Sequence, residues 1–98
     1  MKKILISFAE SAQLDIEAIK QWYVEQQVPE VGERLITEIF RRIETLATHP
    51  DVGRVVPEFR QKFLRELIHP PFRIVYRRDP GRVRIVRVWR SERILLLT

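Results

Sequence analysis

The spacing of the apolar residues changes midway along the chain, and this change constrains the fold most. Between residues 12 and 47 the apolar residues recur at steps of three and four, which is the spacing of one face of a helix. After His49-Pro50 they gather instead in short runs rich in Val, Ile, Phe and Tyr, which is typical of strands. The sequence therefore predicts a helical segment followed by a sheet.

The helical segment is predicted to contain two helices. The first begins at Glu10-Ser11, with Ser11 as the expected N-cap, and ends near Gln27. Val28-Pro29 breaks it, because proline lacks the amide hydrogen and disfavours a helical residue before it. The second apolar stripe runs from Leu35 to Ala47 and stops before proline. The link between the helices is so short that they must lie antiparallel.

Strands are predicted at residues 2–8, 63–68, 72–77 and 83–89, and Asp79-Pro80-Gly81 is expected to form a hairpin turn between the last two. The order is β-α-α-β-β-β. Neither helix can bury its apolar stripe alone, so the α+β fold expected is a helical hairpin on one face of a small, mostly antiparallel sheet. A chain of 98 residues is too short for two cores, so residues 1–98 are expected to form a single domain.

The last strand does not alternate cleanly between apolar and polar residues, since arginines fall on both of its faces. Two explanations stay open at this point. Either a bulge shifts the register of the strand, or the face away from the helices is itself partly apolar and is covered by another segment.

Several classes of chemistry have no support in the sequence. The chain has no cysteine, and its three glycines are scattered singly, so no thiol chemistry or phosphate-binding loop is expected. His49 and His69 each precede proline and have no neighbouring third ligand, so we assign no metal, no cofactor and no catalytic residue. The apolar run after Met1-Lys2-Lys3 is too short for an export signal, and Leu95-Leu96-Leu97 is too short to span a membrane, which favours a cytoplasmic protein.

The positive charge of the chain is concentrated in its second half. Residues 1–49 carry 6 basic and 8 acidic groups, whereas residues 50–98 carry 12 and 5. Glu58, Glu66, Asp79 and Glu92 cannot neutralise eleven arginines, so an external anion is expected, either a phosphate backbone or an acidic protein segment. The candidate binding residues are cations of the predicted sheet and two tryptophans, of which Trp22 lies off the helical stripe: Arg54, Arg65, Arg73, Arg77, Arg87, Arg90, Arg93, Trp22 and Trp89.

The order of several short motifs resembles the ParE branch of the RelE/ParE toxin superfamily over nearly the whole chain. These motifs are Ala12-x-x-Asp15-Ile16-x-x-Ile19-x-x-x-Tyr23, His49-Pro50-Asp51-Val52-Gly53-Arg54, Leu64-Arg65-Glu66-Leu67, Phe72-Arg73-Ile74-Val75-Tyr76-Arg77 and Val86-x-Val88-Trp89-Arg90-x-x-Arg93. The resemblance implies the toxin of a type II toxin–antitoxin pair, neutralised by a ParD-like antitoxin in a hetero-oligomer. It also implies a helical hairpin on a small antiparallel sheet, which is the fold predicted above from the spacing of the apolar residues.

The superfamily divides by target, and the resemblance leaves two functions open. ParE-like members are described as poisons of DNA gyrase, whereas RelE-like members cut messenger RNA in the ribosome and need a proton donor and acceptor near their C-terminus. After Tyr76 this chain has no His, Tyr or Lys, which favours the gyrase-binding branch over the ribonuclease. A third alternative is an inactive family member that only binds its antitoxin. Direct nucleic-acid binding, the residues that touch the target and the conformation from Ile94 to Thr98 also stay open.

Overall fold

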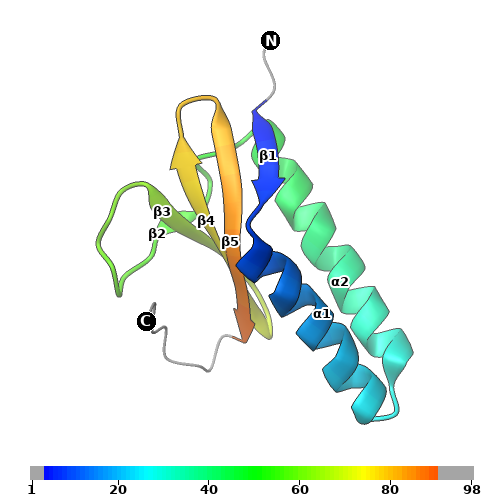
Figure 1. Cartoon of the computed structure of the whole chain (residues 1–98). Helices are drawn as coiled ribbons and strands as arrows, with labels where there is room; N and C mark the ends of the chain where they lie inside the picture. Colours follow the sequence, from blue (N-terminus) through cyan, green and yellow to red (C-terminus); the bar gives the residue numbers. More distant parts are fainter. Residues whose placement is uncertain (1–3, 91–98) are drawn as a thin grey trace.

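Two antiparallel helices lie against one face of a five-stranded sheet (Figure 1). The computed structural model describes residues 4–90, so the expectations for residues 1–3, for Glu92, for Arg93 and for Ile94 to Thr98 lie outside the described residues. The elements in chain order are β1 (Leu5–Phe8), α1 (Glu10–Glu25), α2 (Pro29–Glu44), the 3₁₀ turn η1 (Thr45–Ala47), β2 (Arg54–Val55), β3 (Leu64–His69), β4 (Phe72–Asp79) and β5 (Arg82–Arg90).

The sheet has the strand order β1-β5-β4-β3-β2. Strand β1 pairs with β5 in parallel, and every other neighbouring pair is antiparallel. The predicted α+β fold is confirmed, including the hairpin turn, where Gly81 adopts a φ of 71°. The two-residue strand β2 was not expected, because the sequence predicts only a turn-rich connection there.

The core fills the space between the helices and the sheet. Tyr23, Ile39 and Leu46 from the helical layer pack with Phe72 and Ile74 of β4, and all five are at least nine-tenths buried. Removing each such side chain from water contributes roughly 1.5–3 kcal/mol. The apolar stripes of α1 and α2 therefore hold the helical hairpin on the sheet, as their spacing predicts.

Both helices begin where the sequence predicts, but the N-cap of α1 differs from the prediction. The N-cap of α1 is Ala9, which provides no side-chain cap. Ser11 lies inside the first turn instead, and its hydroxyl donates to the carbonyl oxygen of Val86 in β5 at 2.7 Å. Helix α2 begins at Pro29, directly after the predicted break, because proline is well suited to the first helical position, where no amide hydrogen is needed.

Both explanations for the irregular last strand apply. The register between β4 and β5 shifts between Val75 and Tyr76, and this leaves Val86 as the extra residue of a bulge. The face of the sheet away from the helices, here called the open face, also carries a small apolar cluster around Val56 and Val75, against which Trp89 and Phe59 pack. The connection between β2 and β3 thus covers part of the open face.

Gly53 allows the segment before β2 to approach the core. The Tyr76 hydroxyl accepts a hydrogen bond from the Gly53 amide at 3.0 Å and donates to the Pro50 carbonyl oxygen at 2.8 Å. A Cβ atom at position 53 would lie 2.5 Å from this hydroxyl and 2.8 Å from the Glu66 carbonyl oxygen. The His49-Pro50-Asp51-Val52-Gly53 segment is therefore fixed by one buried tyrosine.

Replacing Gly53 with alanine tests this contact. We expect Gly53→Ala to lower the free energy of unfolding by about 1–3 kcal/mol, because the added methyl group overfills a closed site. Urea unfolding of Gly53→Ala, Tyr76→Phe and the double variant measures the effect. The two costs should sum to more than the cost of the double variant, since both changes disturb the same contact. A Gly53→Ala protein as stable as the parent would contradict the packing described.

Candidate partner-binding surface

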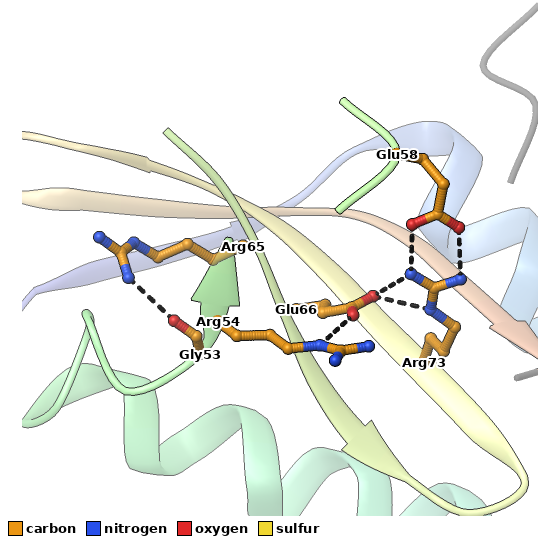
Figure 2. Close-up of polar contacts among 6 residues, drawn as sticks. All are labelled: Gly53, Arg54, Glu58, Arg65, Glu66 and Arg73. Carbon is orange, nitrogen blue, oxygen red and sulfur yellow. Dashed lines mark hydrogen bonds and ion pairs between the residues drawn. The ribbon is translucent and has the colours of Figure 1, made fainter. Parts of the chain in front are cut away.

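A buried glutamate organises the arginines at the centre of the open face (Figure 2). Glu66 of β3 is 1% exposed and accepts hydrogen bonds from two arginines on either side of it. The Arg73 Nε atom lies 2.7 Å from one carboxylate oxygen, and the Arg54 Nε atom lies 2.6 Å from the other. The two guanidinium groups replace the water that a carboxylate loses on burial.

Glu58 completes this cluster from the connection between β2 and β3. Its two carboxylate oxygens accept from Arg73 Nη1 at 2.9 Å and Nη2 at 3.0 Å, a bidentate pair (Figure 2). These hydrogen bonds from Arg73 hold the pKa of Glu58 below its usual range, and the hydrogen bond to Glu58 likewise raises the pKa of Arg73. The Arg73 side chain is only 8% exposed, and both carboxylates that bind it belong to this chain.

Three further predicted binding arginines also have partners within the chain. Arg65 Nη1 donates to the Gly53 carbonyl oxygen at 2.9 Å (Figure 2), and Arg77 pairs with Asp79 at 2.9 Å while its guanidinium lies over the Phe63 ring. Arg87 pairs with Asp15 of α1. The expectation that only four nearby acids pair with the arginines was therefore too narrow. Besides Asp15, Asp51, just before β2, pairs with Arg78.

A cavity between α1 and β5 brings together four of the predicted residues. Trp22, Arg87, Trp89 and Arg90 line it, and its volume is about 230 Å³. The Arg90 guanidinium lies 4.8 Å from the centroid of the Trp22 ring, and that of Arg87 lies 4.5 Å from the centroid of the Trp89 ring. Trp22 is 43% exposed, as its position off the helical stripe predicts. Arg54, Arg65, Arg73 and Arg77 do not line this cavity.

The cavity exists because α1 leaves the sheet where β1 ends. Strand β1 pairs with β5 as far as Phe8 opposite Ile85, and the edge of β5 beyond this point has no neighbouring strand among residues 4–90. Asp15 provides an acceptor for one backbone amide of that edge, because its carboxylate accepts a hydrogen bond from the Val88 amide at 2.9 Å. The same carboxylate accepts from Arg87 Nε and Nη2 at 2.8 Å. One carboxylate therefore joins α1 to β5 and positions the Arg87 side chain.

Sequence reasoning missed the roles of Asp15, Glu58 and Glu66. The sequence did contain one indication for Asp15. Ser11 and Asp15 are four residues apart, so they lie on the same face of the helix. Both side chains bind the backbone of the β5 bulge.

In the described part of the open face, the carboxylates Glu58, Glu66 and Asp79 are each paired with an arginine. Tyr76 is fully buried on the helix side, and its burial raises the pKa of its hydroxyl. His69 contacts Glu38 of α2 at 3.0 Å, and His49 contacts Thr48 at 3.0 Å. Within residues 4–90, no three His, Asp or Glu side chains are grouped as metal ligands.

Comparisons with known proteins decide the family. The model of the ParE toxin of type II toxin–antitoxin systems matches residues 6–95. The chain belongs to this ParE toxin family. Comparison with curated proteins gives no match.

Solved structures of toxin–antitoxin systems share the fold of this ParE-family chain. One, described as a chromosomal ParDE system from P. aeruginosa, has a TM-score of 0.76 at 23% identity and covers 91% of this chain and 97% of that chain. Another, the RelBE2 toxin–antitoxin complex from Mycobacterium tuberculosis, has a TM-score of 0.61 at 20% identity, with 94% and 97% covered. In the described part of the chain, no helix has the length and apolar character needed to cross a membrane.

The joint between α1 and β5 can be tested with a matched pair of helix variants. We expect Asp15→Ala to lower the free energy of unfolding by about 2–3 kcal/mol, because it leaves the Arg87 guanidinium and the Val88 amide without their acceptor. Glu17→Ala, which removes an exposed 3.9 Å pair with Lys20, should change it by less than about 0.5 kcal/mol. Urea unfolding measures both. Equal costs for the two variants would contradict the assigned role of Asp15.

The Glu58–Arg73 pair predicts a dependence of stability on pH. Because the pKa of Glu58 is lowered in the folded protein, its contribution is complete above the ordinary value of 4.5 and is lost as the pH falls through the lowered pKa. We expect Glu58→Gln to be less stable than the parent at neutral pH, with a difference that shrinks on acidification. Thermal unfolding from neutral to acidic pH measures this. A difference that stays constant across that range would refute the pair's contribution.

Proposed function

We propose that this ParE-family protein is a cytoplasmic toxin that inhibits DNA gyrase by binding it, and that a ParD-like antitoxin neutralises it in a hetero-oligomer. Membership of the ParE family supports the toxin assignment. The observation that favours binding over catalysis is that the carboxylates of the open face within residues 4–90 are already paired with arginines, while His69 faces α2 and Tyr76 is buried.

A ribonuclease is the alternative function, and the chemistry of RNA cleavage argues against it. Transfer of a proton to the leaving oxygen needs a group whose pKa lies near the operating pH, and an arginine stays charged throughout. Arg73 is moreover already bound to two carboxylates. The fold likeness to a RelBE2 complex at 20% identity concerns the fold alone.

The antitoxin is proposed to bind at the cavity between α1 and β5. Its lining joins exposed aromatic surface, from Trp22, to the guanidinium groups of Arg87 and Arg90. Buried aromatic anchors beside cations are typical of protein interfaces. The complementary segment would place an apolar side chain against Trp22 and a carboxylate near the arginines.

The gyrase assignment is tested with purified toxin. We expect inhibition of gyrase supercoiling at micromolar toxin and accumulation of cleaved gyrase–DNA complexes. Messenger RNA added to translating ribosomes should stay intact in the presence of the same preparation. No inhibition of gyrase would refute the gyrase target, and site-specific cuts in the message would favour the ribonuclease instead.

The antitoxin site is tested by truncating its exposed aromatic anchor. Trp22→Ala should weaken binding of the cognate antitoxin by about 2 kcal/mol or more, the cost typical of a central aromatic anchor. Val52→Ala is the matched control, because Val52 is also an exposed apolar residue, at 61%, but precedes β2 at the opposite edge of the sheet. Calorimetric titration of both variants measures the difference. Equal affinities would place the antitoxin elsewhere.

A further inference from the structure

Two arginines of the sheet that have no internal partner within residues 4–90 lie at one end of the open face. Arg82 and Arg84 of β5 are exposed, and within residues 4–90 neither side chain forms an ion pair or a hydrogen bond. Arg77 of β4 is exposed beside them. We call these three residues the hairpin-end patch, since they flank the turn between β4 and β5 (Figure 1).

The strand register explains why this charge is not neutralised by the protein. Arg84 lies directly opposite Arg77 on one side and opposite Ser7 of β1 on the other. Arg82 lies opposite Asp79, which already pairs with Arg77, and opposite Leu5. Together with Asp79, the patch therefore has a net charge of +2.

The arrangement has a cost for the fold. Like charges directly opposite each other in a sheet are destabilising, and Arg84 has no compensating contact within residues 4–90. Elsewhere on the open face the arginines are matched by carboxylates, as in the cluster around Glu66. A destabilising pair of exposed cations points to an anion that binds from outside.

We propose that the hairpin-end patch binds the phosphate backbone of duplex DNA. Guanidinium groups match the geometry of phosphate oxygens and stay charged at every relevant pH. The patch lies apart from the cavity between α1 and β5, whose lining it does not share, so DNA and the proposed antitoxin segment would occupy different places. This inference does not require that gyrase is the target.

The surroundings of the patch favour a duplex over the other anionic partners. Single-stranded nucleic acids are held mainly by stacking on exposed aromatic rings, and the Phe63 ring beside the patch, 37% exposed, already has the Arg77 guanidinium over it at 4.6 Å. An acidic peptide needs an apolar anchoring pocket, and within residues 4–90 the apolar side chains beside the patch are the exposed Leu5 and the half-exposed Phe63, neither of which lines a cavity found in the structure. A row of phosphates needs only the cations.

The test measures binding of a short fluorescent DNA duplex by anisotropy, without gyrase, over a range of salt concentrations. Arg82→Ala and Arg84→Ala should each weaken binding about tenfold near 0.05–0.1 M salt and lower the slope of log K against log salt by about 1. Arg41→Ala is the matched control, because Arg41 is an exposed arginine of α2 that also has no side-chain partner within residues 4–90. It should change affinity less than twofold.

A second measurement separates binding from folding. The melting temperature of Arg84→Ala should equal or exceed that of the parent, because the substitution removes a like-charge pair. Loss of DNA binding in a protein of undiminished stability supports the proposal. It is overturned if the parent does not bind the duplex at low salt, or if the three variants bind it equally. It is also overturned if Arg82→Ala and Arg84→Ala lose binding to single-stranded RNA or polyglutamate but keep the duplex.

Discussion

The charge on Glu66 is the constraint on which the open face depends. A carboxylate that is 1% exposed requires cations in contact with it, and Arg54 and Arg73 provide them from β2 and β4. Because Arg73 also binds Glu58, the same contacts tie the connection between β2 and β3 to the sheet. That connection then covers the apolar cluster around Val75. Loss of the Glu66 charge would leave Arg73 with one partner and loosen the whole face.

Outside the cluster around Glu66, the arginines of β5 form two groups with different neighbours. At one end of β5, Arg87 and Arg90 lie against tryptophan rings beside a cavity, a setting that suits a protein segment with an apolar anchor. At the other end, Arg82 and Arg84 lie on a strand face without internal partners among the described residues, a setting that suits phosphates. The proposed antitoxin segment and the proposed DNA would therefore bind at separate surfaces of β5.

The fold could be predicted from the sequence, because helix and strand periods are local properties of the chain. The spacing of Ile16, Ile19 and Tyr23 already identifies the face of α1 that packs on the sheet. The partners of the arginines could not be predicted, because ion pairs such as Asp15–Arg87 join residues 72 positions apart. The prediction of Ser11 as the N-cap of α1 was wrong for the same reason, because the Ser11 hydroxyl donates to β5, a strand that is distant in the sequence.

The central claim is that the arginines of the sheet divide into internally bound and unpartnered groups, and hydrogen exchange at their Nε–H groups tests it most directly. In a ¹⁵N NMR measurement at mildly acidic pH, the Nε–H signals of Arg73 and Arg87 should exchange slowly with water, because each donates to a carboxylate within 2.8 Å. Those of Arg82 and Arg84 should exchange as fast as in a short peptide. Equal rates for Arg73 and Arg84 would contradict the account.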